Sequence, residues 1–122
     1  MSEFGRRIRP YVDREILAAR EAESREQPGV AFSHLERAHI LGQASTVEHV
    51  RAHWHMLLWS IRQRSPQEGL GQLLRIAGAA VTTAVGLVPQ GNTGGTNVSP
   101  FRRMPLPPEL ASCIDEARAS GR

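Results

Sequence analysis

Three short breaker stretches cut residues 3–86 into four segments of helical length, and this spacing constrains the fold more than any other feature. The breakers are Gln27-Pro28-Gly29, Gly42-Gln43-Ala44 and Ser65-Pro66. Between them apolar side chains recur every three or four residues, which is the period of an amphipathic helix. Links this short join antiparallel helices. The spacing predicts an all-α fold with helices over about residues 3–27, 30–41, 45–64 and 66–86.

Local residue chemistry predicts where these helices begin and end. Pro28 disfavours a helical backbone at the residue before it and so ends the first helix. Gly42 suits a left-handed cap at the end of the second helix. Ser45 and Glu48 have the spacing of a capping box that starts the third helix. Pro66 opens the fourth helix, because proline is tolerated in a first turn.

A weak internal sequence repeat relates the two halves of this helical region. AFSHLERA (31–38) aligns with GLGQLLRI (69–76), which matches Ala31 with Gly69, Leu35 with Leu73 and Arg37 with Arg75. Small residues at such positions let two helices approach closely, as in tetratricopeptide-like repeats. We therefore predict a single helical domain over residues 1–122. It has two tetratricopeptide-like antiparallel hairpins (3–42 and 45–86) and a C-terminal part over 87–122.

The C-terminal part begins with an extended segment rich in Gly, Asn and Pro (residues 89–108). A stretch of about twenty residues without regular structure is uncommon in a compact domain. Apolar residues within this one predict that it is ordered and wraps the helices (Val98, Phe101, Met104 and Leu106). Two hairpins are fewer than a free-standing array needs, so we expect this segment to cover an exposed hydrophobic end. A short helix over about 109–119 follows.

Composition narrows the cellular setting and the partners. All 15 basic residues are arginine, the net charge is +3, and the arginines cluster only at 6–9 and 102–103, which disfavours a nucleic-acid surface. The single cysteine, Cys113, excludes an internal disulfide and fits a reducing compartment. The N-terminus lacks the apolar core of a signal peptide. The apolar run 73–88 contains Arg75 and is shorter than the roughly 20 residues of a membrane span. We expect a cytoplasmic protein with no membrane partner.

All five histidines lie between residues 34 and 55. Residues four apart are neighbours on a helix surface, so His49 and His53 can reach one ion together. The evident core stripe of the third helix consists of apolar residues at helical spacing (Val50, Trp54, Leu57 and Ile61). The strip with both histidines, Met56 and Ser60 lies beside that stripe, and His55 points to the opposite side.

The second helix supplies the rest of the candidate site. Glu36 and His39 have the spacing of the carboxylate–histidine motif of di-iron bundles, whereas His34 lies about 140° around the helix from His39. The short link after this helix would bring His39 opposite the histidines of the third helix. Imidazole and carboxylate ligands favour zinc, cobalt, nickel or iron(II). We predict a metal site made of His39, His49, His53 and Glu36, with His34, Gln43 and Met56 as accessory candidates.

These residues also have plain structural interpretations. The His-x3-His spacing occurs by chance, and buried histidines often bond to carbonyl oxygens. The chain has neither the His-Glu-x-x-His of a metalloprotease nor the second Glu-x-x-His of a di-iron centre. Met56 is also a natural core filler. The loop GNTGGTN, with Asn92, Thr93 and Asn97 near the candidate site, looks like a phosphate-binding loop but lacks the Lys-Ser/Thr of a P-loop.

Four strings of the chain are HLERAHILGQ, HVRAHWHML, GQLLRIAGAA and GNTGGTNVSPFRRMPLPPEL. Together they resemble a bacterial family catalogued as domain of unknown function 3703, over about residues 14–110. The resemblance implies a small, stand-alone, cytoplasmic helical protein in which the segments around four of the histidines and residues 92–97 are characteristic. It transfers no activity, substrate or cofactor.

Two hypotheses of function follow. In the first, the protein binds a divalent metal ion through its histidine cluster, for sensing, storage or delivery rather than catalysis. In the alternative, a tetratricopeptide-like module binds a protein or peptide, the histidines are structural, and Arg37 and Arg75 face a partner carboxylate. A metal-dependent hydrolase with Glu36 or Glu48 as base has less support. Trp54 and Trp59 face different surfaces, one of which is a candidate homodimer contact.

Overall fold

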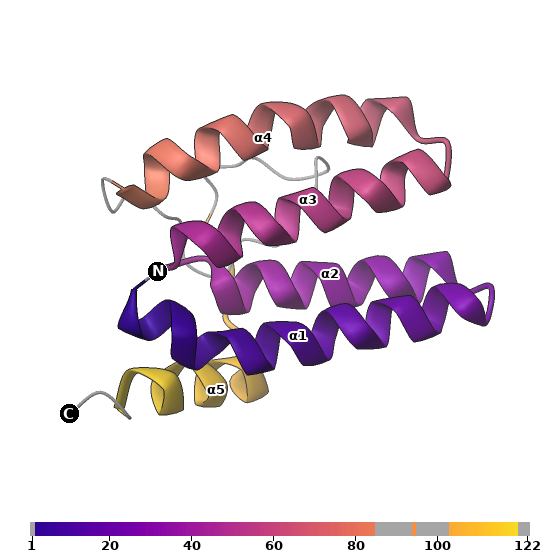
Figure 1. The fold of residues 1–122 in the computed structure, drawn as a ribbon. Helices are drawn as coiled ribbons and strands as arrows, with labels where there is room; N and C mark the ends of the chain where they lie inside the picture. Colours follow the sequence, from indigo (N-terminus) through magenta and orange to yellow (C-terminus); the bar gives the residue numbers. More distant parts are fainter. Residues whose placement is uncertain (1, 85–93, 95–102, 120–122) are drawn as a thin grey trace.

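The computed structural model describes residues 2–84, 94 and 103–119, apart from the side chains of 80–84. Its helices confirm the all-α prediction: α1 (Glu3–Ser24), α2 (Pro28–Gly42), α3 (Thr46–Arg62), α4 (Pro66–Ala84) and α5 (Pro108–Ala119) (Figure 1). None of these helices is long and apolar enough, within the described residues, to cross a membrane. The likeness to tetratricopeptide repeats stays a prediction.

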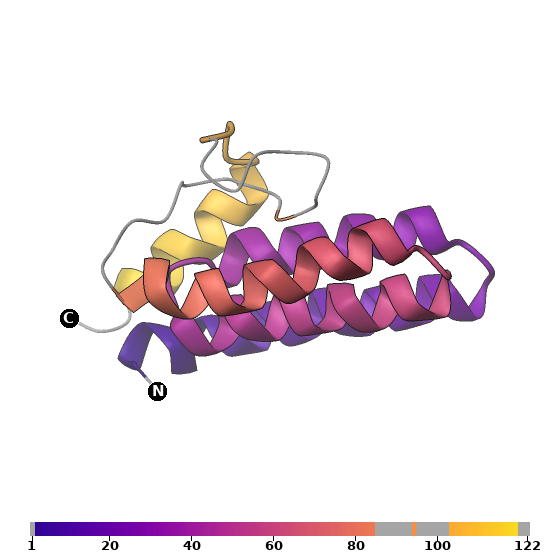
Figure 2. The ribbon, with the colours of Figure 1, turned by 90° about the horizontal axis from the view of Figure 1, so that it is seen from above.

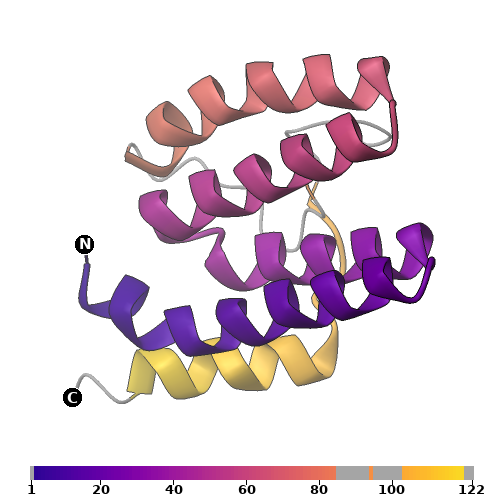
Figure 3. The same ribbon diagram turned by 45° about the vertical axis from the view of Figure 1, so that its right-hand side comes forward.

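The helices lie in the order α5, α1, α2, α3 and α4 across the molecule, so α4 forms one outer edge (Figure 1, Figure 3). The connections between the first four helices are short, and successive helices run antiparallel and pack directly on each other. The last helix, α5, returns to pack on both α1 and α2. Seen from above, it lies to one side of the other four helices (Figure 2).

The main hydrophobic core is formed chiefly by α1, α2 and α5. Its members are almost all aliphatic, as the low aromatic content requires: Ile8, Val12, Ile16, Ala19, Ala22, Ala31, Leu35, Ala38, Ile40, Leu41, Met56, Leu110, Ile114 and Ala117. Polar contacts at the edge of this core hold α5 in place. The Nε of Arg7 donates to the carbonyl oxygen of Ala117 at 2.6 Å, and Arg37 pairs with Glu109 at 2.8 Å.

The first and third turns differ from their predicted positions. α1 ends at Ser24 rather than at residue 27, and Glu26 takes a left-handed backbone with φ 59° that closes the turn. Pro28 lies in the first turn of α2, where its missing N–H is tolerated, and does not end α1. Arg64, with φ 54°, lies beyond the end of α3 rather than inside the helix.

Gly42 has a role other than the predicted left-handed cap. It lies inside α2, and the next residue, Gln43, keeps a right-handed helical backbone. A Cβ on Gly42 would lie 2.7 Å from the Cβ of Glu48, so this glycine is needed where α2 and α3 approach closely. The predicted N-cap is confirmed, because Ser45 Oγ accepts a hydrogen bond from the backbone N–H of Glu48 at 3.4 Å.

The predicted core stripe of α3 is confirmed at Leu57, which is buried, and is wrong at two other positions. Trp54 and Ile61 are 50% and 63% exposed, whereas the strip that holds the histidines faces inward. The buried residues of α3 are Glu48, His49, Ala52, His53, Met56, Leu57 and Ser60. The physical cause is close packing, since a Cβ on Gly69 of α4 would lie only 3.0 Å from the Oγ of Ser60. Small residues such as Ser60 and Gly69 allow α3 and α4 to approach closely on this face, and hydrophobicity alone does not identify it.

Most of the predicted wrapping segment (residues 85–93 and 95–102) lies outside the described residues. Within the described part, Gly94 is buried and Leu106 packs against the hydrophobic core before α5 begins. α5 then covers α1 and α2 rather than α4. The outer helix keeps three leucines largely exposed: Leu70, Leu73 and Leu74.

Candidate metal centre

Three histidines from two helices meet where α2 ends and α3 begins. His39 lies in the last turn of α2, and His49 and His53 lie one turn apart near the start of α3. The Nε2 atom of His39 lies 3.0 Å from the Nε2 of His49 and 3.1 Å from the Nε2 of His53. All three residues are buried. In the described part of the chain, one nitrogen of each ring lies within 4.8 Å of the other two, a spacing at which one ion can contact all three.

Hydrogen bonding among the rings does not satisfy this cluster. A neutral imidazole carries one N–H and one lone pair. The Nδ1 of His53 contacts the side-chain oxygen of Gln72 at 2.5 Å, and because that oxygen only accepts, the proton of His53 is on Nδ1. The Nε2 of His39 has either a proton or a lone pair, so it forms a well-directed hydrogen bond with only one of its two Nε2 neighbours. The other contact is unfavourable without a cation.

Gln72 of α4 holds His53 in this tautomer. Its side-chain NH2 group donates to Glu68 Oε1 at 3.1 Å and to the carbonyl oxygen of Gly94 at 3.0 Å. Its oxygen is therefore the atom that faces His53. In metal sites a histidine ligand commonly donates its second N–H to such an acceptor, which orients the ring toward the ion.

Gly94 brings a distant part of the chain onto the cluster. Its backbone has φ 83°, which favours glycine. A Cβ at this position would lie 2.6 Å from the Cδ2 of His39. Its carbonyl oxygen also accepts a hydrogen bond from Arg75 at 2.9 Å. The backbone of Gly94 therefore packs directly against the His39 ring, and only a residue without a side chain fits there.

Burial keeps two of the histidines neutral at pH 7. Desolvation and, to a smaller extent, the nearby His53 together lower the pKa of His49 to about 3. Desolvation also lowers the pKa of His53 to about 4, against the hydrogen bond with Gln72, which raises it. Arg75 adds to the lowering of the His53 pKa. Neutral imidazoles are the form that binds a metal ion.

Two of the three nitrogen–nitrogen separations fit a four-coordinate divalent ion. Zinc–nitrogen bonds of about 2.0–2.1 Å place two ligands of a tetrahedral site about 3.3 Å apart. The measured separations of 3.0 and 3.1 Å are within a few tenths of an ångström of that value. Three imidazoles suit zinc, cobalt, nickel or iron(II), whereas magnesium and calcium prefer oxygen ligands.

The other predicted site residues lie at the edge of the cluster or away from it. Glu36 is half-buried one turn before His39 and is not part of the close group, and Gln43 is buried just after α2. Their roles as ligands stay predictions. His34 faces α1, where its Nδ1 lies 3.0 Å from Glu15, and Met56 belongs to the hydrophobic core. The predicted loop residues lie outside the described residues: Asn92, Thr93 and Asn97.

Sequence reasoning did not identify Gln72 and Gly94 as parts of the site. A signal for Gln72 is present, because it is a lone amide on the buried stripe of an apolar helix, between Gly69 and Ile76. A buried amide requires hydrogen-bond partners. Gly94 has no such signal, since several glycines surround it and the residue that needs its close approach is His39, far away in the sequence.

Comparison with known proteins gives a family but no activity. No curated protein and no solved structure matches the chain. One family model, described as a protein of unknown function (DUF3703), matches residues 6–114. The match includes the three clustered histidines, Gln72 and Gly94. The chain therefore belongs to the DUF3703 family.

Proposed function

We propose that the protein binds one divalent transition-metal ion through the Nε2 atoms of His39, His49 and His53. The observation that carries the proposal is their convergence, with Nε2–Nε2 separations of 3.0 and 3.1 Å that cannot both be well-directed hydrogen bonds. A cation between the rings would use all three lone pairs. Zinc, cobalt, nickel and iron(II) suit this donor set.

The burial of the cluster supports a role in metal sensing, storage or delivery in the cytoplasm rather than in catalysis. Each of the three residues is at most 6% exposed, which leaves a substrate little access. One of the two buried Nε2–Nε2 contacts of His39 is not a well-directed hydrogen bond, and such a contact costs free energy. An ion that binds only the folded chain would offset this cost and stabilise the protein by about 4 kcal/mol at a thousandfold excess over its Kd.

Elemental analysis and titration calorimetry on protein prepared without a histidine tag test the proposal. We expect about one zinc, cobalt or nickel ion per chain. The double variant His49→Ala/His53→Ala should lose at least about a hundredfold in affinity, because two of three ligands are gone. His55→Ala is the matched control on the same helix, and it should bind as the wild type does.

Two further measurements separate metal binding from folding. Circular dichroism reports whether the double variant keeps its helices. The visible spectrum of the cobalt-loaded wild type should show the intense bands of a tetrahedral site with nitrogen ligands. Wild-type protein that takes up none of these ions, or a folded double variant that binds as tightly, would remove the proposal.

The second candidate function is an interaction module, and the outer face of α4 favours it. Leu70, Leu73 and Leu74 are 62%, 54% and 69% exposed and lie on one side of the helix. An uncharged apolar stripe on one helix can be covered by the same stripe of a second copy around a two-fold axis. Sedimentation of the wild type should then show a dimer, and Leu70→Gln/Leu74→Gln should shift it to a monomer. A wild type that sediments as a monomer at high concentration would exclude the homodimer.

A further inference from the structure

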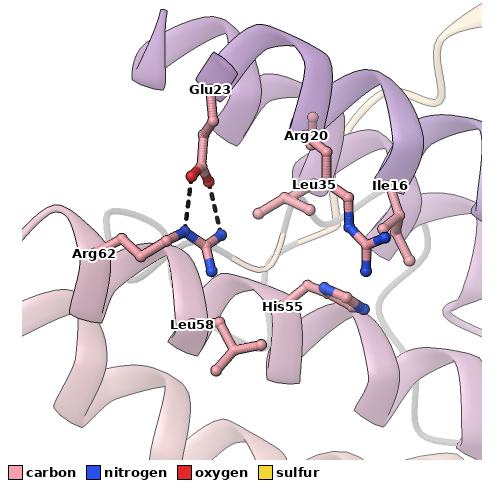
Figure 4. Close-up of a pocket in the computed structure, with 8 residues that line it drawn as sticks. Ile16, Arg20, Glu23, Leu35, His55, Leu58 and Arg62 are labelled. Atoms are coloured by element: carbon pink, nitrogen blue, oxygen red, sulfur yellow. Dashed lines mark hydrogen bonds and ion pairs between the residues drawn. The ribbon is translucent and has the colours of Figure 1, made fainter. Parts of the chain in front are cut away.

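A pocket separate from the histidine cluster opens between α1, α2 and α3. It has a volume of about 280 Å³ and is lined by Ile16, Ala19, Arg20, Glu23, Leu35, His55, Leu58 and Arg62 (Figure 4). Small-molecule sites have volumes of about 300–1,000 Å³. The pocket is therefore slightly below this range and suits a compact ligand rather than a nucleotide.

The floor of the pocket is apolar. Ile16, Ala19 and Leu35 belong to the buried hydrophobic core and present their side chains there. Leu58 of α3 adds a half-buried apolar wall on the opposite side. An apolar group of a ligand would be removed from water on this floor, which is favourable in proportion to the area buried.

The rim of the pocket is positively charged. The guanidinium group of Arg62 donates two hydrogen bonds to the carboxylate of Glu23, and both N–O distances are 2.7 Å. In the described part of the chain, by contrast, no carboxylate pairs with Arg20. Arg20 and His55 project toward each other across the pocket (Figure 4). Two guanidinium groups against one carboxylate leave one positive charge in excess, and the excess lies at Arg20.

The two arginines that were predicted to face a partner carboxylate, Arg37 and Arg75, do not line this pocket. Arg37 pairs with Glu15 and Glu109, and Arg75 donates to the carbonyl oxygen of Gly94. Arg20 is therefore the better candidate to receive an anion. The guanidinium group matches the planar geometry of a carboxylate and can bind it with two parallel hydrogen bonds.

We propose that this pocket binds a small organic monocarboxylate with an apolar body. The carboxylate pairs with Arg20 at the rim, and the apolar body lies on Ile16, Leu35 and Leu58. Inorganic phosphate would meet the charge but leave the apolar floor in contact with water. A neutral alcohol of the same shape would cover the floor but leave Arg20 without a partner. The site therefore recognises the combination of the two features.

Titration followed by ligand-observed NMR, with benzoate and hexanoate as probes, tests the proposal. Both should bind in the millimolar range or tighter, and at least about tenfold more tightly than benzyl alcohol or phosphate. Arg20→Gln should weaken benzoate binding about tenfold. Arg14→Gln, on the same helix but stacked on Tyr11 away from the pocket, is the matched control and should leave binding unchanged.

Leu58→Ala tests the apolar half of the site. It should weaken hexanoate more than it weakens acetate, because only the longer acid reaches the floor. Benzoate should bind with the same affinity in the presence of a chelator and in the presence of zinc. The test of the pocket is therefore independent of the test of the metal site. The pocket proposal is overturned if neither acid binds, if benzyl alcohol binds as well as benzoate, or if folded Arg20→Gln binds benzoate like the wild type.

Discussion

α2 and α4 are the second helices of the two hairpins and carry similar residues at matched positions, yet their surroundings differ. Ala31 and Gly69 are matched and both are buried. Leu35 and Leu73 are matched as well, but Leu35 is 2% exposed and Leu73 is 54% exposed. Among the described helices, α2 contacts α1, α3 and α5, whereas α4 contacts only α3. The two matched sequences therefore form matched helices, but the helices differ in burial and in their neighbours.

The two hairpins also differ in what they bury. The interior of α1 and α2, closed by α5, is aliphatic. The interior around α3, by contrast, contains polar residues: Glu48, His49, His53, Ser60 and Gln72. Buried polar groups contribute little net stability even when hydrogen-bonded, and they cost free energy when they are not. The first hairpin with α5 therefore supplies most of the hydrophobic core, and the second hairpin supplies most of the buried polar residues, which join His39 of α2 at the candidate metal site.

The largest expected effect is the loss of unfolding free energy in acid, which protonates the buried histidines of the polar interior. His49 and His53 have pKa values of about 3 and 4 in the folded chain and about 6.5 when unfolded. Below pH 6.5 the unfolded chain binds protons that the folded chain does not, so stability falls as the pH falls toward 4. The metal-free protein should lose up to about 5 kcal/mol of unfolding free energy between pH 6.5 and 4.5.

Urea unfolding in chelator at several pH values measures this loss. The double variant His49→Leu/His53→Leu should show a much smaller dependence on pH in the same range. A flat wild-type profile between pH 6.5 and 4.5 would contradict the lowered pKa values, because it would mean that the folded and unfolded chains bind the same number of protons.

The matched leucines give the next largest effect. Leu35→Ala should lower the free energy of unfolding by about 3 kcal/mol, because it leaves a cavity in the core. Leu73→Ala should change it by less than about 0.5 kcal/mol, because the side chain is more than half exposed. Urea unfolding of the monomeric protein measures both. A large loss in Leu73→Ala would show that the outer face of α4 is covered in solution.

Much of the fold could be predicted because its signals are local. Pro66 and Ser45 begin helices as their backbone chemistry indicates, and the short links define the antiparallel order. The orientation of α3 could not be predicted in the same way. Trp54 and Ile61 are the most apolar residues on one side, yet small residues such as Ala52 lie on the buried side. Which face is buried depends on how closely other helices approach, which is a tertiary property.

The candidate site shows the same limit. The pairing of His49 with His53 follows from helical spacing, and the opposition of His39 follows from the short link. Gln72 and Gly94 come from later parts of the chain, and their contacts with the histidines depend on the packing of α4. Local patterns thus predict residues that share a helix or a hairpin, and they miss residues that tertiary packing adds.

Gln72 of α4 and His34 of α2 occupy matched positions in the repeated sequence. Substituting each of them compares the contributions of the two helices to the metal site. Gln72→Leu removes the acceptor that orients His53. We expect it to lower zinc affinity by about 10- to 100-fold, the usual cost of losing such an orienting group. His34→Leu should leave the affinity unchanged. Calorimetry measures both, and equal affinities in the two variants would contradict the orienting role of Gln72.

The smallest expected effect is a difference in salt dependence between substitutions of Arg37 and Arg75, the arginines at matched positions of α2 and α4. Arg37 forms partly exposed ion pairs with Glu15 and Glu109, so Arg37→Gln should lower the free energy of unfolding by about 0.5–1 kcal/mol. In 1 M salt the screening length falls to about 3 Å, and most of this difference should disappear.

Arg75 donates to a backbone carbonyl and also lies near the charge of Glu68, so the small loss in Arg75→Gln should depend less on salt than the loss in Arg37→Gln. Urea unfolding of both variants at low and high salt measures the contrast. A salt-independent loss in Arg37→Gln would mean that its packing under α5, rather than its charge, is what matters. In that case α2 is buried because its shape fits against α5, and the difference in burial between α2 and α4 arises from packing alone.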